Sequence, residues 1–367
     1  MIAGTQKETP MPEGKASISR KNALDRLGSV ADDLFLTLPK LIKPFKPAHA
    51  IDRKTYEKQI DFYFDRGFVA NPRDFFYLPE PPPDDEGAES RSFLDGTRTI
   101  YRFASQYSPQ NPMLKDKFLS FEENRTAWLV KWAHGDTGRK TLLCLHGYLL
   151  GDPDQAERMF KIEKLYQMGL DVALFITPFH WRRAPKSRRL KSIFLQPEDA
   201  PMTCECFGQA MHDLYQCISL LEQQGGREIG IVGASLGGYN AALIASLTDR
   251  LRFSALMVPA IKFNTGDFRP DAVRHPFVVD DRLLEKIRSV WTLHSPLNFM
   301  PQIPAYRILV VAARGDKLCP FENVLSLCEK WQWPRHLFMT GGHWLMFNAK
   351  ARGRTWYRFL SDMGFDH

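Results

Sequence analysis

Short apolar segments alternate with amphipathic segments along the C-terminal part of the chain. Each apolar segment has the length of a strand that is buried in a parallel sheet. These segments are Leu142–Leu145, Val172–Ile176, Ile229–Val232, Ala255–Val258 and Ile308–Ala312. The segments between them predict helices, most clearly where apolar residues recur at helical spacing in Phe207, Met211, Leu214, Ile218 and Leu221. Strands that alternate with helices predict an α/β fold around a mostly parallel sheet, with helices on both faces.

Two earlier segments carry a different pattern. Apolar and polar residues alternate with a period near two in Ile100–Tyr107 and Arg125–Ala133, which also contain aromatic residues. This pattern predicts antiparallel strands that precede the parallel ones.

The interval between the strands predicted at Ala255–Val258 and Ile308–Ala312 is longer than one crossover helix needs. It is rich in proline, phenylalanine and charge, and it contains one helical pattern near Asp281–Ser289. We therefore expect an insertion over the sheet edge at about residues 261–304. Together with the N-terminal region, this insertion is expected to form a cap over the site.

The N-terminal part of the chain has its own organisation. Residues 1–20 are polar and are expected to form a flexible tail. Residues 21–96 contain residues typical of helix ends together with many aromatic residues. This pattern predicts a helical and loop extension that packs on the core or on the cap. Within it, the Pro-rich run Pro79–Gly87 cannot hold a helix and predicts a linker or exposed loop. Residues 97–367 are then the α/β domain.

Composition narrows the class of protein. The chain has 367 residues, of which 44% are hydrophobic and 25% are charged, so a globular protein is expected rather than a disordered or fibrous one. No apolar run approaches the ~20 residues of a membrane-spanning helix, and the N-terminus lacks the apolar core of a signal peptide. The six cysteines form no Cys-x-x-Cys pair. We expect them to be reduced in the cytoplasm, with four of them, Cys319 included, buried as apolar residues.

The net charge of +7 is concentrated locally. Residues 182–191 hold six cations and no acid. A nucleic-acid-binding protein spreads such residues over a face, so this class is disfavoured. The run is either a solvated loop or a contact for an anionic substrate group or anionic lipid. Together with the mixed apolar and basic residues 38–46, it leaves peripheral membrane contact open.

A serine follows one of the predicted strands in a glycine-rich turn. Gly233-Ala234-Ser235-Leu236-Gly237-Gly238 connects the strand Ile229–Val232 to a helix predicted at Tyr239–Leu247. A sharp strand-to-helix turn forces close backbone contacts, so its flanks require glycine, and it lifts the serine above the sheet. Ser235 is therefore a candidate nucleophile, the alternative being a structural turn with an incidental serine.

A base and an orienting acid are available at the same sheet edge. His343 follows the predicted strand Leu337–Met339, and Asp316 follows the strand Ile308–Ala312. Ligand sites form at this edge of a parallel sheet. A surface histidine and a turn or helix-capping aspartate are the alternatives. The other candidate acids are in the insertion and follow no strand: Asp267, Asp280 and Asp281.

The chain order Ser235, Asp316, His343 resembles that of the α/β-hydrolase superfamily, over about residues 97–365. The resemblance implies an α/β-hydrolase fold with these residues as a catalytic triad. The turn Leu145-His146-Gly147-Tyr148 is similar to one that supplies an oxyanion donor in that superfamily. It implies the backbone N–H groups of Tyr148 and Leu236 as the oxyanion hole.

The segment Thr177–Arg183 is similar to a P-[FY]-H-x-x-R stretch of the dienelactone-hydrolase-like and acetyl-esterase-like branches. This similarity favours those branches. We consider His146, Arg182 and Arg183 as candidates for substrate binding, although His146 also suits a structural role within its own turn.

These features together predict a serine hydrolase that cleaves a carboxylic ester through an acyl-enzyme, without a metal or an organic cofactor. The substrate would be a small-molecule ester or a lipid. Lipase, thioesterase and peptidase activities remain alternatives on the same fold. An alternative of another class is a non-catalytic, membrane-associated binding module. The acyl chain, the alcohol and the oligomeric state stay open.

Overall fold

One sheet of nine strands runs through the molecule. The computed structural model describes residues 23–37, 51–79, 88–136, 138–186, 193–263 and 275–366. The strand order across the sheet is β1-β2-β3-β5-β4-β6-β7-β8-β9. The strands are β1 (Ala88–Phe93), β2 (Gly96–Ala104), β3 (Thr126–Ala133), β4 (Thr141–Leu145), β5 (Asp171–Phe175), β6 (Ile229–Ala234), β7 (Phe253–Met257), β8 (Ile308–Ala313) and β9 (Arg335–Met339).

The directions of the strands confirm the predicted sheet. β1, β2 and β3 form antiparallel pairs, and β3 also pairs with β5 in antiparallel fashion. From β5 to β9 every neighbouring pair is parallel. β4 lies between β5 and β6, and in its register Leu143 faces Ala173 on one side and Ile231 on the other. All five residues of β4 are buried, which explains why every residue after Thr141 is apolar.

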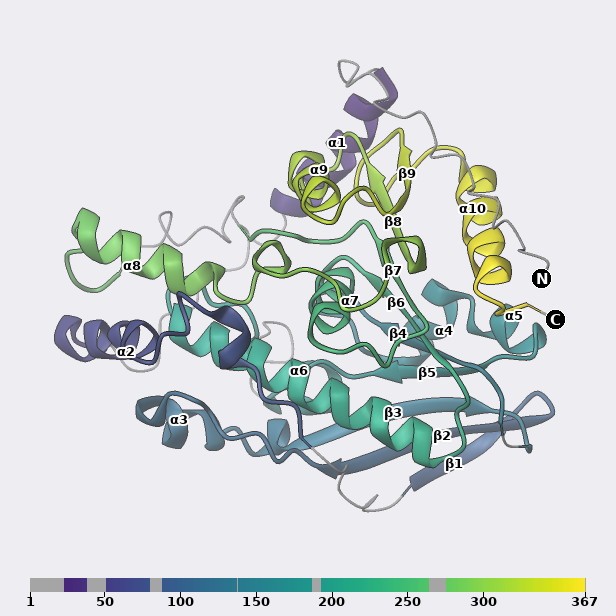
Figure 1. The fold of residues 1–367 in the computed structure, drawn as a ribbon, viewed down its shortest axis with the longest axis horizontal. Coiled ribbons are helices and arrows are strands. Elements are labelled where there is room, and N and C mark those ends of the chain that lie inside the picture. The colour runs from purple at the N-terminus through teal and green to yellow at the C-terminus, as the bar shows by residue number, and fades with distance from the viewer. Residues whose placement is uncertain are drawn as a thin grey trace, which may run out of the picture.

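Helices cover both faces of the sheet (Figure 1). One hydrophobic core joins the sheet to α6, α7 and α9, and a second core on the opposite face joins it to α4, α5 and α10. The helices are α1 (Ala23–Thr37), α2 (Arg53–Asp65), α3 (Lys115–Leu119), α4 (Pro153–Phe160), α5 (Ile162–Gln167), α6 (Ala200–Gln223), α7 (Leu236–Leu247), α8 (Asp281–Thr292), α9 (Phe321–Lys330) and α10 (Ala349–Asp362). None of the helices in the described ranges is both long and apolar enough to cross a bilayer.

Helix α6 begins earlier than its apolar spacing indicates. Its N-cap is Asp199, whose carboxylate accepts a hydrogen bond from the amide of Met202 at 3.1 Å. The first turns contain Glu205, a fully buried acid whose carboxylate accepts from the hydroxyls of Tyr63 at 2.7 Å and Tyr107 at 2.6 Å and from the amides of residues 110 and 111. Four donors satisfy the buried charge, and they tie the N-terminal segment to the core.

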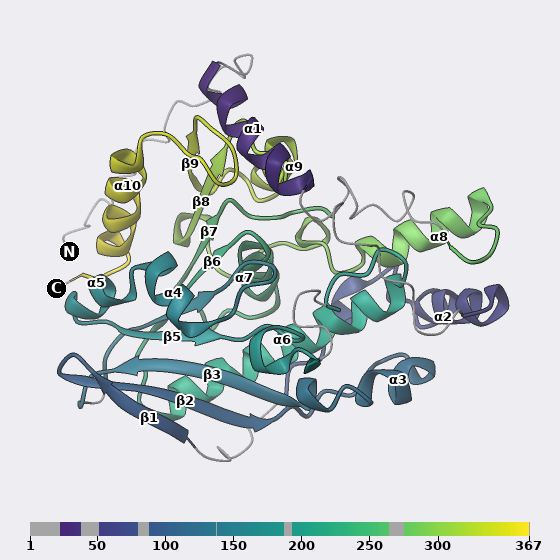
Figure 2. The ribbon, with the colours of Figure 1, turned by 180° about the vertical axis from the view of Figure 1, so that it is seen from behind.

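Helices α2 and α8 lie side by side at one end of the molecule, as Figures 1 and 2 show from opposite sides. Together with the start of α6 they enclose a separate apolar cluster that includes Tyr56, Tyr63, Leu283 and Trp291. Helix α8 lies inside the expected insertion and contains the helix predicted at Asp281–Ser289. The N-terminal segment and the insertion therefore pack against each other.

Helix α1 occupies a different place. It lies beside α9 and the end of β9 in both views (Figures 1 and 2). Strand β1 also belongs to the segment expected as an N-terminal extension, so the sheet begins before residue 97. The expected tail at residues 1–20 and most of the Pro-rich run, from residue 80 to 87, lie outside the described residues.

Candidate active site

The nucleophile candidate Ser235 stands at the junction of β6 and α7. Its backbone has φ 57° and ψ −115°, a conformation that L-residues adopt only when the surroundings impose it. The Ser235 amide donates to the Met257 carbonyl at 3.0 Å, and its own carbonyl accepts from the amides of Tyr239 and Ala260 at 3.1 Å each. These bonds hold the strained turn, and the side chain remains partly exposed.

The two flanking glycines are required by close backbone contacts. A Cβ at Gly233 would lie 2.0 Å from the carbonyl oxygen of Gly237, and a Cβ at Gly237 would lie 2.0 Å from the carbonyl oxygen of Leu145. The latter contact brings α7 against the end of β4. These distances supply the steric reason that the sequence motif implied.

His343 and Asp316 meet at the same edge of the sheet. Asp316 follows β8, His343 follows the neighbouring strand β9, and His343 Nδ1 lies 2.8 Å from Asp316 Oδ2. Both side chains are buried, at 5% and 3% exposure. The remaining carboxylate oxygen, Asp316 Oδ1, accepts the amide of Cys319 at 2.7 Å. The bond to Nδ1 leaves Nε2 as the nitrogen that can exchange a proton with a substrate or nucleophile.

The thiol of Cys319 joins these groups to Ser235. Cys319 Sγ lies 3.9 Å from Ser235 Oγ, and it lies within 4.8 Å of ligand atoms of both Asp316 and His343. Cys319 is buried, as predicted, but its contact with the site was not predicted. Its position three residues after Asp316 could have indicated this contact, because that spacing places its amide on the carboxylate.

The environment adjusts the protonation of the three groups. Burial raises the pKa of Asp316, and the bond to His343 opposes this rise. Burial also raises the pKa of the Cys319 thiol. For His343, burial opposes protonation, but its contacts with Cys319 and Asp316 outweigh burial and raise its pKa. The His343–Asp316 pair therefore favours the imidazolium that a general base becomes.

Among the described residues, Asp316, Cys319 and His343 form the group of metal-ligating side chains that lie close together. The Asp316 carboxylate and His343 Nδ1 are already joined by a 2.8 Å hydrogen bond. This hydrogen bond between an acid and a histidine accounts for the proximity of the two residues.

The loop after β4 lies against the serine. A Cβ at Gly147 would be 3.7 Å from the Ser235 Cβ, so the next amide, that of Tyr148, belongs to the surroundings of the nucleophile. His146 is fully buried; its Nδ1 lies 2.9 Å from the Gly147 carbonyl oxygen, and its Nε2 accepts from the amide of Thr177 at 3.1 Å. Burial lowers the pKa of His146 to about 4.

Both ring nitrogens of His146 are thus used within the protein, which contradicts the expected role in substrate binding. The neutral ring ties the loop after β4 to the loop after β5. The structural alternative is the correct one for this residue.

The structure also corrects the prediction for Arg183. Its side chain is completely buried and pairs with the buried Asp213 at 2.6 Å, and its guanidinium also donates to the carbonyls of Ile176 and Asn124. It has no surface to offer a substrate, so the expectation that it binds one is wrong. Arg182 instead lies at the surface and pairs with Glu89 at 2.8 Å. Residues 187–191 of the basic run lie outside the described residues.

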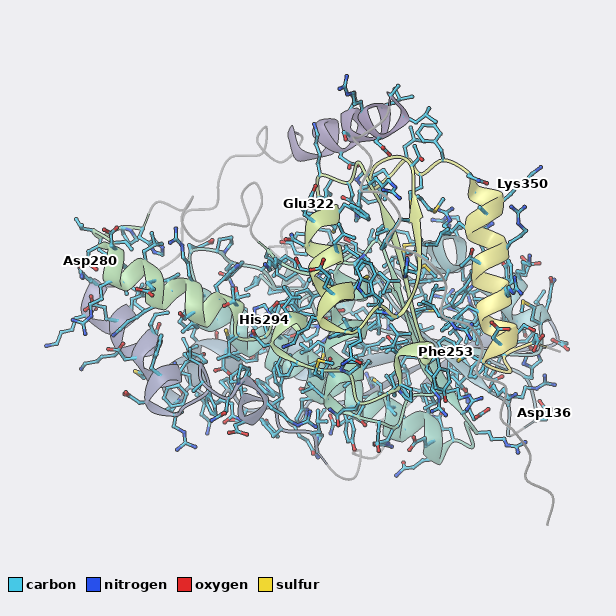
Figure 3. The ribbon with its side chains drawn as sticks, turned by 45° about the horizontal axis from the view of Figure 1, so that its top comes forward. Asp136, Phe253, Asp280, His294, Glu322 and Lys350 are labelled. Carbon is cyan, nitrogen blue, oxygen red and sulfur yellow. The ribbon has the colours of Figure 1, made fainter. Side chains whose placement is uncertain are left out.

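The alternative acids have other roles, are exposed or lie outside the described residues. Asp280 caps α8 through the amide of Leu283 at 2.9 Å and pairs with Arg53. In Figure 3 it lies at the outer end of α8, far from Glu322 at the start of α9. Asp281 is exposed, and Asp267 lies outside the described residues. Asp316 is therefore the acid in contact with His343.

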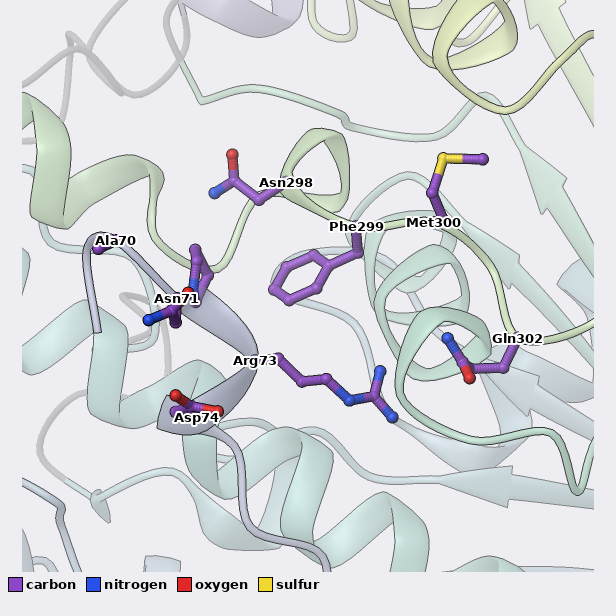
Figure 4. Close-up of a pocket in the computed structure, with 9 residues that line it drawn as sticks. Ala70, Asn71, Arg73, Asp74, Asn298, Phe299, Met300 and Gln302 are labelled. Atoms are coloured by element: carbon purple, nitrogen blue, oxygen red, sulfur yellow. The ribbon is translucent and has the colours of Figure 1, made fainter. Parts of the chain in front are cut away.

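A cavity of about 640 Å³ lies elsewhere, between residues 70–74 and the segment after α8. Arg73 extends across it (Figure 4). Its guanidinium donates to the last carbonyls of α7, those of Ser246 at 2.8 Å and Leu247 at 3.1 Å. Donors of this kind satisfy a helix C-terminus, so the contact supports α7, the helix that follows Ser235.

The fold is the α/β-hydrolase fold. Acetyl xylan esterase 1 from a Thermoanaerobacterium species superposes with a TM-score of 0.57 at 14% identity, covering 86% of this chain and 99% of that one. An acetyl xylan esterase from a Paenibacillus species gives a TM-score of 0.53 at 13% identity, covering 87% and 97%. The predicted fold class is confirmed, and the acetyl-esterase-like branch is among the similar structures.

Two comparisons concern sequence. Residues 201–268 match the model of an uncharacterised protein family, UPF0227. Uncharacterised proteins from two strains of Mycobacterium tuberculosis are each 28% identical to this chain over 361 residues, covering 95% of this chain and 85% of theirs. The similarity to these proteins thus extends through the N-terminal segment as well as the α/β domain.

Proposed function

We propose that this α/β-hydrolase is a serine hydrolase that cleaves carboxylic esters through an acyl-enzyme intermediate. The single observation that carries the proposal is the 2.8 Å bond between His343 Nδ1 and Asp316 Oδ2, formed at the sheet edge where Ser235 stands in a strained turn. An acid that orients a histidine at the same sheet edge as a partly exposed serine is the arrangement that activates such a serine.

The mechanism assigns one role to each residue. Ser235 Oγ attacks the ester carbonyl, while His343 Nε2 removes the hydroxyl proton. Asp316 fixes the tautomer with Nδ1–H and stabilises the imidazolium. His343 then gives the proton to the departing alcohol. Water, activated by His343, hydrolyses the acyl-enzyme and releases the acid.

The developing oxyanion is assigned to the amides of Tyr148 and Leu236. Two features support the assignment. Gly147 packs beside Ser235, and Leu236 is the first residue of α7, where helix geometry directs the amide and the positive end of the dipole toward the serine. His146 holds the loop that carries the first of these amides.

The proposed cap consists of α2 and α8. They enclose the aromatic cluster that begins at α6, and Phe263 links this cluster to Tyr239 on α7, with ring centroids 4.8 Å apart. An aromatic layer that reaches the helix of the nucleophile favours an apolar acyl or aryl group in the substrate. Small acetyl esters are the first substrates to test, because two of the similar structures are acetyl xylan esterases.

The test is a series of p-nitrophenyl esters from acetyl to palmitoyl, together with a thioester and a peptide anilide, each assayed with the wild-type protein and Ser235→Ala. We expect ester hydrolysis by the wild type and background rates from the variant, with the same melting temperature. A preference for long acyl chains, the thioester or the anilide would assign the lipase, thioesterase or peptidase alternative. Equal hydrolysis by both proteins would reject Ser235 as the nucleophile.

A further inference from the structure

Helix α1 turns its polar side inward. Along its described part, the buried residues are Asp25, Gly28, Ser29 and Asp32. The apolar residues Leu24, Leu27 and Val30 in the same part are 46%, 54% and 63% exposed. An ordinary surface helix buries its apolar face, whereas the described side chains of α1 are buried on a polar face. The contacts of this polar face fix the described part of the helix.

Asp32 contacts the loops that carry both His343 and Asp316. The carboxylate is fully buried, and each of its oxygens accepts the backbone amide of His343 at 2.9 Å. Asp32 Oδ2 also accepts the amide of Lys317, next to Asp316, at 3.0 Å. A single carboxylate therefore joins the residue that is the proposed base to the residue that follows the proposed acid.

The neighbouring positions of α1 strengthen this connection. Asp25 accepts the amide of Gly341 at 2.9 Å, and the hydroxyl of Ser29 donates to the carbonyl of Gly315 at 2.6 Å. Gly28 lies directly on the His343 loop, since a Cβ there would be 2.0 Å from the amide nitrogen of Gly342. Each residue of the buried face thus contacts one of the two loops.

These contacts act on the geometry that the proposed chemistry needs. The two loops follow neighbouring strands, and the hydrogen bond between His343 and Asp316 requires a fixed separation between them. A misplacement of 1 Å at an active site is enough to cost ~10²-fold in rate. Hydrogen bonds from backbone amides to a buried charge are strong and directional, which suits them to fix both loops at once.

The negative charge of Asp32 also affects its neighbours. Burial is the main cause of the raised pKa of Asp316, and the charge of Asp32 adds to it. The titratable and charged residues near Asp32 are Asp25 on the same helix, Asp316 and Lys317 after β8, and His343 after β9. A negative charge at Asp32 favours the imidazolium form of His343 over the neutral ring.

We propose that Asp32 is a positioning residue of the active site, which aligns His343 with Asp316 through their backbone and makes helix α1 a required part of the catalytic centre. This inference rests on the proposed function and extends it to a residue outside the α/β domain. Asp32 touches no reacting atom in this scheme.

The test compares Asp32→Asn with Asp116→Asn, the same change at an exposed acid on α3. An asparagine amide nitrogen cannot accept the hydrogen bonds that one carboxylate oxygen accepts, and the charge is lost. We expect kcat on an ester to fall about 10- to 100-fold with little change in KM. We also expect the acid limb of the kcat/KM profile to move to lower pH, because His343 loses a negative neighbour. Asp116→Asn should match the wild type in every measurement.

Two results for Asp32→Asn would contradict a positioning role. Wild-type kcat and an unmoved pH profile in folded Asp32→Asn would overturn the proposal, as would a loss of kcat with no movement of the acid limb. If Asp32→Asn does not fold, Asp25→Asn replaces it, with a reduced rate of fluorophosphonate labelling expected and the wild-type rate contradicting the proposal. Failure of the proposed function differs from both outcomes, since the wild type itself would then hydrolyse no ester.

Discussion

Asp316 and Asp32 are both buried acids that contact His343, and they contact different parts of it. Asp316 bonds the imidazole ring, whereas Asp32 accepts the backbone amide of the same residue. Asp316 lies on the sheet, in a loop whose position follows from strand topology. Asp32 lies on a helix near the N-terminus and is separated from His343 by 311 positions in the sequence.

The two contacts are expected to affect catalysis in different ways. A side-chain contact with the ring determines its tautomer and its charge, so its removal should alter the chemical step itself. A backbone contact determines where the ring stands, so its removal should alter the rate by a smaller factor. A third buried acid, Asp213, contacts Arg183 and no part of the site. It serves as the reference for an acid whose role is structural.

The largest effect is expected at Asp316. Asp316→Asn should lower kcat by about four orders of magnitude, because asparagine permits the wrong tautomer of His343. The bond to Asp316 also helps to raise the pKa of His343. The residual activity should therefore show an acid limb at lower pH than the wild type. Steady-state kinetics over pH 4 to about 9 would measure both effects, and near-normal turnover would show that another group orients the histidine.

An intermediate effect is expected from moving α1 without changing any acid. In Gly28→Ala the new methyl group would meet the backbone of the His343 loop, so we expect kcat to fall about 10- to 100-fold. The matched control is Gly353→Ala in α10, where nothing lies within 4 Å of a Cβ.

The control should be slightly stabilised, by about 0.5–1 kcal/mol, with unchanged kcat. Kinetic assays and thermal melts of the two variants give both values. Equal turnover in Gly28→Ala and Gly353→Ala would mean that the docking of α1 does not matter to the site.

The smallest effect on turnover is expected at Arg183. Arg183→Gln leaves Asp213 buried without its partner, which should cost about 3–5 kcal/mol of stability. Turnover of the fraction that remains folded should be close to normal, because the pair does not contact the site. The neighbouring surface variant Arg182→Gln should lose at most about 1 kcal/mol. Urea unfolding and kinetics at low temperature would separate the two outcomes, and a raised KM in folded Arg183→Gln would restore its role in substrate binding.

The sheet could be predicted because its strands have a simple pattern. β4, β6 and β8 are buried on both faces along nearly all of their length, so almost every residue in them is non-polar. β1 could not be predicted, since its sequence Ala-Glu-Ser-Arg-Ser-Phe is mostly polar and it pairs with β2 at the edge of the sheet. An edge strand that is exposed to water shows no apolar pattern.

The start of α6 was missed for a related reason. Its first turns are buried on all sides and include Glu205. A helix that is surrounded by protein has no polar face to alternate with an apolar one. Only the four donors that surround the carboxylate explain why a glutamate is found there, and they come from distant parts of the chain.

One part of the candidate site can also be predicted from the sequence, and another part cannot. The approach of His343 to Asp316 follows from their places after neighbouring parallel strands, which sequence order reveals. The place of Asp32 does not, because the pattern of α1 would assign Leu24, Leu27 and Val30 to the inside. The opposite orientation depends on hydrogen bonds to loops more than 280 residues away, and no local pattern records such a partner.

The proposed mechanism depends on the activation of Ser235. The reaction of the wild-type protein with a fluorophosphonate, followed by mass spectrometry of the labelled peptide, measures this activation. We expect one label per chain, located on Ser235, none in Ser235→Ala and slower labelling in Asp316→Asn. A label on another residue, or ester hydrolysis by a wild-type protein that resists labelling, would show that Ser235 is not the nucleophile.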